Sequence, residues 1–508
     1  MPRDVVTDQD LFRPLITASE MFPALERLVL GARSEVLMAF RIFDARASLR
    51  SAEARKLGLK TWADLLAHTA GRGVKLRLLM ADFDPVFASD LHRAAWASAR
   101  NFGHRLPDNA EILCALHECK SGALWRRIFW SKIKARIDEL SRHDGAHLTP
   151  LQHQAVKGKV TLRPVSLHQK FAVADGDHAI IGGIDVDERR YDDADHDRPA
   201  NETWHDISVE VTGAVAPDIR RHFADCWNRA RRADAASFGG SLTGVDQTAP
   251  LRPASEKCLD PQLIRTISCH PGSALRLGAS PQVTEHEAAH LDAIEGAERL
   301  IYIETQFFRH APIARALARA AQRAPELQLI LVMPTEPERV IFNGDDGIDV
   351  RHAQSLQLRC LDICRRAFGD RMAVLAPAQP RAAPDHTPLP LQGAEIIYLH
   401  SKVTLVDEAM GIIGSANLNG RSMRWDTEAS LMFRDAAQIR ALRNRLTRYW
   451  LRDHADDGDP TRAATWQRIA ANAAMLSPER RSTFLLPWPE RRNRRFARFL
   501  PILPPEMF

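Results

Sequence analysis

Two short segments of the chain carry the same reactive side chains at the same spacing. Each reads His, any residue, Lys, four residues, Asp, and then an apolar run that ends in small residues. The segments are LHQKFAVADGDHAIIGG, with His168, Lys170 and Asp175, and LHSKVTLVDEAMGIIGS, with His400, Lys402 and Asp407. Residues i and i+2 of a strand point to the same face, so each His and Lys can meet one ligand. Together the two segments predict a single site shared across a pseudo-twofold interface.

Lysine is rare in this chain, which makes its presence in both segments informative. Of the 69 Lys and Arg residues, 11 are Lys. The two positions therefore favour a compact ammonium over a planar guanidinium. The alternative is a duplicated unit in which His and Lys are only surface polar residues, and we favour the shared site.

Two His and two Lys suit the cleavage of a phosphodiester. One neutral imidazole can attack phosphorus, the other can protonate the departing alkoxide, and the ammonium groups can hold the nonbridging oxygens. Because the lysines supply the positive charge, we expect no metal and no other cofactor. A zinc site formed by His168 and His400 is the alternative, but the adjacent lysines would oppose the cation.

A histidine that acts as nucleophile or acid needs its second nitrogen held, usually by a carboxylate. One acid follows each motif on the equivalent expected strand: Asp206 in WHDISVEV and Glu428 in DTEASLMF. We expect each acid to hold the histidine of its own half. Asp175 and Asp407 fall five residues after the lysines, and we expect them to brace the turn rather than touch substrate.

The elements around the motifs repeat as well. Each half begins with an amphipathic helix and a short apolar strand, EMFPALERLVLGA and SEVLMAF in one, HEAAHLDAIEGA and RLIYIETQFF in the other. A second helix and strand follow, and then the motif. Alternating strands and helices predict an α/β fold, with an α-β-α sandwich in each half and one active site between them. A segment rich in Gly, Pro and Ser places the boundary near residue 250, giving domains 1–250 and 251–508.

The doubled motif resembles the HKD motif of the phospholipase D superfamily, and the resemblance covers both halves. The second copy continues into GSAN, with Ser415 and Asn417, whereas the first continues into GGIDV, with Gly183 and Asp185. The run GGIDVDERRYD, the segment TWHD and the strand IYIETQFF are similar to segments of the lipid-hydrolysing branch, although Thr305 replaces the usual Asn.

The resemblance implies a covalent phosphohistidine and assigns roles to several residues. His168, Lys170, His400, Lys402, Asp206 and Glu428 would be catalytic, with His168 the nucleophile and His400 the general acid. Gly183, Asp185, Ser415 and Asn417 would lie against the substrate, where backbone or side-chain donors can hold phosphate oxygens. Glu304 would lie at the pocket mouth, or have a structural role.

The function that we expect is hydrolysis or head-group exchange of phospholipids, with phosphatidic acid as one product. The partners would be a phospholipid at a membrane surface and a water or alcohol acceptor. A cardiolipin-synthase-like phosphatidyltransferase is the first alternative and a nuclease the second; we do not expect nucleic acid as a partner. A binding module without catalysis is disfavoured because His and Lys are intact in both copies.

Composition fits an ordinary globular protein. The 508 residues are 45% hydrophobic and the formal charge is +5. A chain of this length does not need disulfides for stability, and an odd number of Cys, seven, fits reduced thiols. The amino terminus lacks the pattern of a secretory signal, and no run of 18 apolar residues occurs. We expect a cytoplasmic monomer, at most peripheral to a membrane, while export without a cleavable signal stays open.

One helical segment has two interpretations. LWRRIFWSKIKARIDEL places Trp125, Phe129, Lys132 and Arg136 at helical spacing. It could rest on an anionic membrane, or it could cover a core. We favour the cover.

Overall fold

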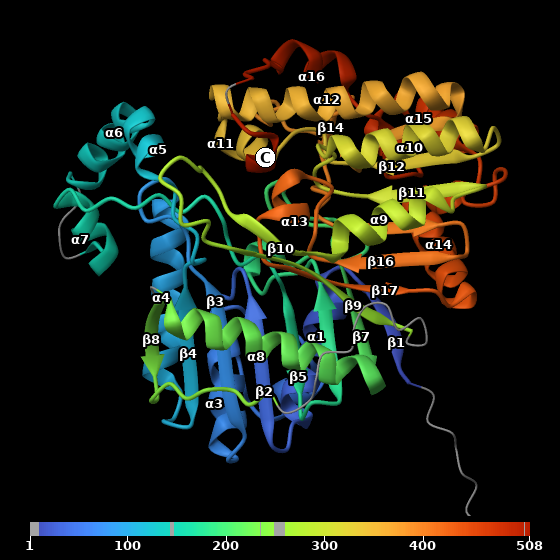
Figure 1. The fold of residues 1–508 in the computed structure, drawn as a ribbon. Coiled ribbons are helices and arrows are strands. Elements are labelled where there is room, and N and C mark those ends of the chain that lie inside the picture. Colours follow the sequence, from blue (N-terminus) through green and yellow to red (C-terminus); the bar gives the residue numbers. More distant parts are fainter. Residues whose placement is uncertain (1–9, 143–146, 234, 248–259, 502) are drawn as a thin grey trace, which may run out of the picture.

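The computed structural model describes residues 10–142, 147–233, 235–247, 260–501 and 503–508. Two twisted sheets dominate it, one from each half of the chain, and Figure 1 shows the first below the second. The expected boundary near residue 250 lies outside the described residues, so the division at that point stays a prediction.

The first half builds an eight-stranded sheet in the order β1-β7-β6-β5-β2-β3-β4-β8. Its elements are β1 (Phe12–Ile16), α1 (Ala18–Gly31), β2 (Glu35–Phe40), α2 (Ala52–Lys56), α3 (Trp62–Gly71), β3 (Lys75–Ala81), α4 (Ser89–Arg105), β4 (Ala110–Ala115), α5 (Ala123–Ile128), α6 (Trp130–Leu140), α7 (Pro150–Val156), β5 (Phe171–Ala174), β6 (His178–Gly182), β7 (Ile207–Thr212), α8 (Ala216–Arg232) and β8 (Ala235–Gly239).

The second half builds a ten-stranded sheet in the order β10-β9-β17-β16-β15-β11-β12-β13-β14, with β18 paired to β13. Its elements are β9 (Gln262–Cys269), β10 (Ser280–Thr284), α9 (Glu285–Glu295), β11 (Leu300–Glu304), α10 (Ala311–Arg323), β12 (Gln328–Val332), α11 (Glu338–Asn343), α12 (Ile348–Phe368), β13 (Met372–Ala382), β14 (Ala394–Ile396), β15 (Val403–Val406), β16 (Met410–Gly414), α13 (Gly420–Arg424), β17 (Glu428–Phe433), α14 (Ala436–Leu451), α15 (Ala463–Ala474), β18 (Leu485–Pro487) and α16 (Glu490–Phe496).

The two sheets share a central strand order. The series β7-β6-β5-β2-β3-β4 in the first sheet matches β17-β16-β15-β11-β12-β13 in the second. In both sheets, the strand that follows the motif His and Lys pairs antiparallel with the strand that follows the first helix of the repeat. These pairs are β5 with β2 and β15 with β11. The predicted repeat of elements is therefore confirmed, and so is the α/β fold with two equivalent halves.

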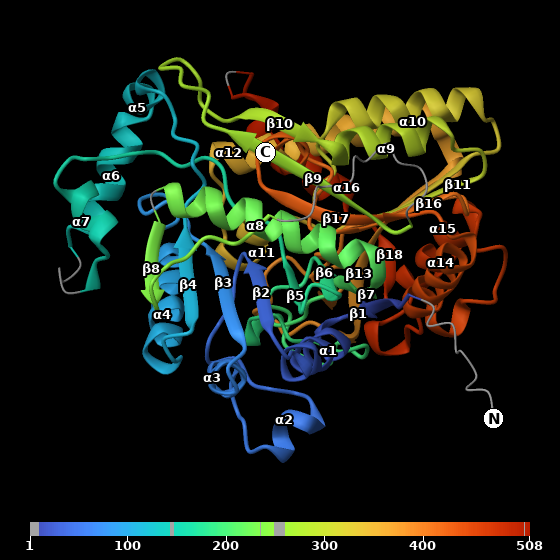
Figure 2. The same ribbon diagram turned by 60° about the horizontal axis from the view of Figure 1, so that its bottom comes forward.

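Helices cover both faces of each sheet, which accounts for the alternation of buried side chains along the strands. On β2, Val36 and Met38 pack towards α1, α3 and α4, whereas Leu37 and Ala39 pack towards α8. The second sheet is packed in the same way, with α10 and α12 on one face and α14 and α15 on the other. Figure 2 shows α8 and α1 on opposite sides of the first sheet. The predicted α-β-α sandwiches are confirmed.

Short parallel bridges join the two halves beside the motifs. Leu167 pairs with Thr427, and His205 pairs with Leu399. The bridges also include hydrogen bonds from the backbone N–H of His168 to Thr427 O and of His400 to His205 O, at 2.9 and 2.8 Å. Each motif histidine therefore begins where its chain segment runs beside the acid-bearing strand of the other half.

The described residues between β4 and the first motif, 116–142 and 147–166, form an arm that carries α5, α6 and α7. Figure 1 shows this arm projecting from the side of the first sheet. No residue of α5 is buried, and α6 buries only Ile133 and Leu140. The expectation that this segment mainly covers a core is wrong for α5, because none of its side chains is buried. Within the described residues, no helix is both long and apolar enough to cross a membrane.

Candidate active site

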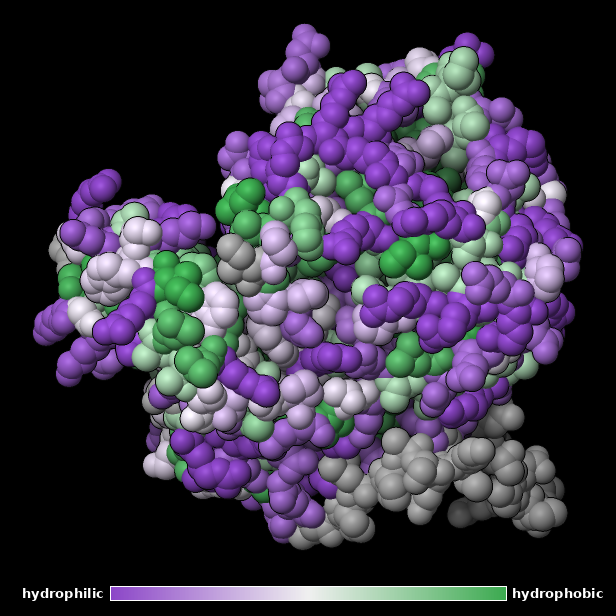
Figure 3. Space-filling view, turned by 45° about the horizontal axis from the view of Figure 1, so that its top comes forward, coloured by the Kyte–Doolittle hydropathy of each residue, from purple (hydrophilic) through white to green (hydrophobic). Residues whose placement is uncertain are grey.

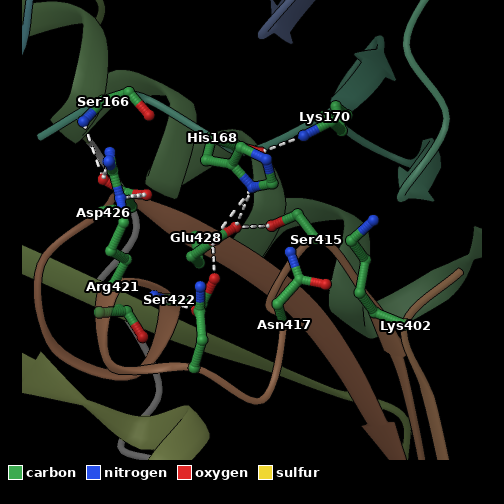
Figure 4. A network of polar contacts seen from close by, with 12 residues as sticks. Ser166, His168, Lys170, Lys402, Ser415, Asn417, Arg421, Ser422, Asp426 and Glu428 are labelled. Atoms are coloured by element: carbon green, nitrogen blue, oxygen red, sulfur yellow. Dashed lines mark hydrogen bonds and ion pairs between the residues drawn. The ribbon is translucent and has the colours of Figure 1, made fainter. Parts of the chain in front are cut away.

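The first motif histidine is held by an acid from the other half of the chain. Nδ1 of His168 lies 3.0 Å from the carboxylate of Glu428, although the two residues are 260 positions apart. Figure 4 shows this contact, with the Glu428 carboxylate between His168 and two serines. The hydroxyl of Ser415 donates to one Glu428 oxygen, and that of Ser422 donates to the other at 2.7 Å. These donors fix the carboxylate that orients the imidazole.

The second motif histidine is held by the reciprocal contact. Nδ1 of His400 lies 2.6 Å from Oδ2 of Asp206. The ring of Trp204 packs on the His400 imidazole with centroids 5.0 Å apart. His400 is thus fixed by one acid and one aromatic ring, both from the first half.

The expected pairing within each half is therefore wrong, since the acids cross over. The reason lies in the two interface bridges. Leu167 is paired with Thr427, so the next residues, His168 and Glu428, come to lie side by side. In the same way the bridge of His205 and Leu399 brings Asp206 next to His400. Within one sheet, by contrast, another strand separates the motif strand from the acid strand.

Both imidazoles keep one nitrogen for chemistry. Among the described residues, Nε2 of His168 and Nε2 of His400 have no hydrogen-bond partner, while both Nδ1 atoms face carboxylates. Both rings are largely buried, at 8% exposure for His168 and 3% for His400. This is the arrangement that a nucleophile and an acid need, with one nitrogen oriented and the other available.

The two lysines lie in the same buried region. Nζ of Lys170 donates to the carbonyl oxygen of His168 at 2.6 Å. Nζ of Lys402 donates to the carbonyl oxygen of His400 and lies 2.8 Å from Nδ1 of that ring. In Figure 4 Lys402 and Asn417, from the second half, lie near His168 and Lys170 from the first. The structure thus brings all four motif side chains to one interface.

Burial favours the neutral form of most of these groups. Desolvation, reinforced by the charge of Lys170, holds the pKa of His168 well below its usual range, and desolvation with Lys402 does the same to the pKa of His400. Burial raises the pKa of Asp206 to about 7 and that of Glu428 to about 8. It lowers the pKa of Lys402 to about 7. An anion that entered would favour protonation of the histidines and lysines.

Known proteins resemble the chain in both sequence and fold. A family model described as "Cardiolipin synthase, PLD-like domain" matches residues 290–450. Phospholipase D1 of Saccharomyces cerevisiae is 25% identical over 54% of this chain, and Phospholipase D1 of Mus musculus is 27% identical over 46%. The chain belongs to the phospholipase D superfamily. Its aligned part spans 21% and 24% of the length of those two relatives.

The fold agrees with that of a solved member of the phospholipase D superfamily. The structure of a phosphatidylserine synthase from Haemophilus influenzae superposes with a TM-score of 0.52, at 13% identity, over 86% of each chain. The likeness therefore includes both halves rather than one motif.

The superfamily resemblance also placed Gly183 and Ser415 against the substrate, and the structure shows what each contacts. A Cβ on Gly183 would lie 2.1 Å from Oδ1 of Asp206, so the absence of a side chain makes room for that carboxylate. Ser415, at the equivalent position, instead uses its hydroxyl to hold Glu428. Both residues act on the acids that orient the histidines, and contact with substrate stays a prediction for each.

Asp185 and Asn417 differ in how far their polar atoms are used. The carboxylate of Asp185 accepts from the backbone N–H of Ile42 at 2.8 Å and from Arg190 at 2.5 Å, and it is buried. The amide nitrogen of Asn417 lies 3.5 Å from Gln306, and its buried Oδ1 has no partner among the described residues. Of the four expected substrate contacts, Asn417 is the one with an uncommitted polar atom at the site.

Asp175 and Asp407 lie in turns away from the imidazoles. Both have positive φ, at 52° and 51°. Asp175 accepts from the backbone N–H groups of residues 33–35, which lead into β2, and Asp407 accepts from those of residues 298–300, which lead into β11. They tie the motif turn to the neighbouring strand.

Two supporting residues, Ser422 and Trp204, were not identified from the sequence, whereas Glu304 was. Ser422 on α13 and Trp204 before Asp206 contact the acid and the imidazole described above. Glu304 is fully buried and accepts hydrogen bonds from Tyr302, Ser401 and Trp450, which favours the structural role over a place at the pocket mouth. Only the WHD segment signalled Trp204 in advance.

No group of three or more His, Cys, Asp or Glu side chains among the described residues is arranged to hold a metal ion. The positive charges present at the site are those of Lys170, Lys402 and nearby arginines.

Proposed function

We propose that the chain is a phospholipase D-type phosphodiesterase, which hydrolyses phospholipids at the head-group ester or transfers the phosphatidyl group to an alcohol. The observation that supports this most is the crossed pair of imidazoles, each with Nδ1 on a carboxylate and Nε2 available. The names of the curated relatives point to the same substrate class.

In the first step, Nε2 of His168 attacks phosphorus and the bond from phosphorus to the head-group oxygen breaks. Nε2–H of His400 gives its proton to the departing alkoxide, so the head group leaves as an alcohol. Lys170, Lys402 and an N–H of the Asn417 amide donate to the nonbridging oxygens, where negative charge is concentrated. Glu428 in its ionised form accepts from Nδ1–H of His168, which leaves Nε2 unprotonated, and it stabilises the positive charge that develops on the ring.

In the second step, water or an alcohol attacks phosphorus while Nε2 of His400, now neutral, takes its proton. The bond between phosphorus and His168 breaks, and phosphatidic acid or a phosphatidyl alcohol is released. The lysines keep the charge that the oxygens need throughout, so no metal is required in this proposal.

A cardiolipin-synthase-like phosphatidyltransferase is the second candidate, and the description of the matching family model favours it. The difference lies in the acceptor, which would be the hydroxyl of another phospholipid rather than water.

One experiment separates the candidates. Purified protein is incubated with mixed phospholipids or with plasmid DNA, each with and without a primary alcohol, and the His168→Ala variant serves as the control. The proposal predicts phosphatidic acid without alcohol and a phosphatidyl alcohol with it. Cardiolipin from phosphatidylglycerol without phosphatidic acid would favour the transferase, and nicked DNA with unchanged lipids would favour a nuclease.

A further inference from the structure

The arm presents apolar and basic side chains that nothing in the described chain covers. Leu124 and Ile128 on α5 are 43% and 52% exposed, and Leu275 of the second half is 69% exposed. Trp130, at the start of α6, is 52% exposed. Figure 3 shows green side chains gathered on the arm at the left of the molecule, among purple ones. Exposed apolar groups rimmed by polar ones commonly mark a binding surface.

These side chains form one surface because the second half is fastened to the base of α5. The backbone N–H of Leu124 donates to Ala274 O at 3.2 Å, and the indole of Trp125 donates to Leu275 O at 2.8 Å. Leu124 and Ile128 are four residues apart, so they lie on the same side of the helix. We call this surface the arm face. It consists of Leu124, Ile128 and Leu275, together with the cations Arg127, Lys132, Lys134 and Arg276.

The cations of the arm face lack acidic partners. Arg127, Lys132 and Lys134 are exposed, and none of them forms an ion pair with a described residue. Arg276 follows Leu275, and within the described part of the chain its guanidinium donates only to the hydroxyl of Ser280, at 3.1 Å. Five of the 11 lysines of this arginine-rich chain fall within residues 120–159. The surface therefore attracts anions without being neutralised by its own neighbours.

A pocket adjoins the arm face. It has a volume of about 480 Å³ and is lined by Trp125, Leu275, Leu277, Trp425 and Leu503, among others. Trp425 lies three residues before Glu428 in the sequence. The next residue, Asp426, accepts a hydrogen bond at 2.9 Å from the backbone N–H of Ser166, and Ser166 is two residues before His168. The pocket thus contacts, through Trp425, the segment that helps to position the first histidine.

We propose that the arm face docks on the surface of an anionic phospholipid bilayer. Leu124, Ile128 and Leu275 would enter the boundary between head groups and acyl chains, while Arg127, Lys132 and Lys134 would meet lipid phosphates. This inference rests on the proposed function, because it places the site beside the lipid that the site would cleave. The charge of the arm face selects an anionic surface over a zwitterionic one.

The chain offers a matched pair of variants to test this proposal. Arg127→Glu with Ile128→Ser changes a cation and the adjacent apolar residue on α5, and Lys56→Glu with Leu57→Ser makes the same change at the end of α2. The exposed fraction of Leu57 is 54%, similar to the 52% of Ile128. Binding is measured by flotation with vesicles of phosphatidylcholine alone or with about one third phosphatidylglycerol, in the His168→Ala background so that vesicles stay intact.

The α5 variant should bind the anionic vesicles at least about tenfold more weakly, and the α2 variant should bind like the parent. The ratio of activity on vesicles to activity on a monomeric short-chain phospholipid should fall in the α5 variant only. Equal binding of both variants, or equal binding of the parent to neutral vesicles, would overturn the proposal. Binding to plasmid DNA in place of vesicles would assign the arm face to nucleic acid. Vesicle binding without lipid cleavage would instead contradict the proposed function alone.

A second, independent observation concerns Arg41, the residue after β2. Its side chain has no hydrogen bond or ion pair with any described residue, and its buried Nε has no acceptor. The guanidinium lies 5.1 Å from the centre of the Phe83 ring. Nearby arginines are paired, Arg190 with Asp185 and Arg421 with Asp426. A largely buried cation without a hydrogen-bond acceptor or an opposite charge is unfavourable, unless a ligand supplies that partner.

The strand register places Arg41 at the active site. Ala39 lies opposite Phe171, and Glu304 lies opposite Val403; Phe171 and Val403 are each the third residue after a motif histidine. Arg41 is therefore the pseudo-twofold counterpart of Gln306, which contacts Asn417 and Tyr398. The charge of Arg41 also contributes, after burial and Lys170, to the lowered pKa of His168.

We propose that Arg41 binds a second anionic group on the substrate, so that the preferred head groups bear a carboxylate or another phosphate. A phosphodiester has one negative charge, which Lys170 and Lys402 already suffice to hold. A planar guanidinium without an acceptor suits a carboxylate or phosphate, which it can bind through two N–H groups. This inference also rests on the proposed function.

The test compares kcat/KM for phosphatidylserine and cardiolipin with that for phosphatidylcholine, each at the same low fraction in neutral detergent micelles. Wild-type protein should favour the anionic head groups, and Arg41→Gln should lower that ratio at least about tenfold. Arg41→Lys should keep part of the preference. An unchanged ratio in Arg41→Gln, or a wild-type preference for phosphatidylcholine, would overturn the inference. Absence of cleavage of every phospholipid would instead contradict the proposed function.

Discussion

Glu428 lies 3.0 Å from Nδ1 of His168, and the equivalent acid of the first half, Asp206, lies 2.6 Å from His400. Each histidine is therefore oriented by the half of the chain that does not contain it. Neither half alone can form the contact between a motif histidine and its orienting acid. The proposed chemistry therefore requires the interface between the halves. Two of the predictions below depend on this crossing.

The crossed pairing predicts which catalytic step each acid supports. With a phosphodiester whose leaving group needs no proton, Glu428→Gln should slow the burst of leaving group by about 100-fold or more, because His168 loses its orienting carboxylate. Asp206→Asn should leave most of the burst and slow the following hydrolysis, because it acts on His400. Rapid-mixing kinetics measures both phases. The opposite assignment of the two variants would mean either that the acids serve the histidines of their own halves or that His168 and His400 exchange roles.

A side chain at position 183 should displace Asp206. In Gly183→Ala the new Cβ would lie 2.1 Å from the carboxylate oxygen, so Asp206 must move away from His400. We expect activity to fall by about tenfold or more, since small displacements of orienting groups are costly. Gly31→Ala is the matched control, because its Cβ would meet nothing within 4 Å. Full activity in Gly183→Ala would show that this close approach is dispensable.

Burial of Glu428 predicts a pH-dependent stability difference. Its pKa rises from 4.5 to about 8 on folding, so the folded state retains a proton that the unfolded state has lost. The resulting contribution is fully present below about pH 4.5 and is lost as the pH rises through about 8. Glu428→Gln stays neutral throughout. The melting temperature of this variant minus that of the wild type should therefore increase as the pH is raised from about 5 to about 8.

The control for that measurement is Glu408→Gln on the surface. Hydrogen bonding and the charge of Arg440 lower the pKa of Glu408 to about 2, so its contribution is lost only as the pH falls through that value. The difference between this variant and wild type should stay constant over the same range. A constant difference for Glu428→Gln as well would contradict the raised pKa.

Catalysis should persist in excess EDTA, because Lys170 and Lys402 are proposed to supply the charge that a metal supplies elsewhere. The measurement is phosphatidic acid release before and after dialysis against the chelator. Activity that disappears and returns only with an added divalent ion would contradict the metal-free proposal.

The sequence predicted the parts of this site but not their partnership. The repeated motif, the order of strands and helices, and both acids could be identified because spacing and hydrophobic periodicity are local properties. The crossing of Asp206 and Glu428 depends on the bridges of Leu167 and His205, which are single contacts between segments far apart in the sequence. The unpaired state of Arg41 and the exposure of α5 likewise depend on which neighbours are absent, and no local pattern reports that.

The central claim is that a covalent phosphohistidine forms on His168 within a site shared by both halves. The most direct test denatures the protein rapidly during turnover of a phosphorus-labelled phospholipid, in alkaline solution, and maps the label by peptide mass. The account predicts label on the peptide that contains His168. Label on the His400 peptide alone would reverse the two roles, and turnover without label on either peptide would contradict the covalent mechanism.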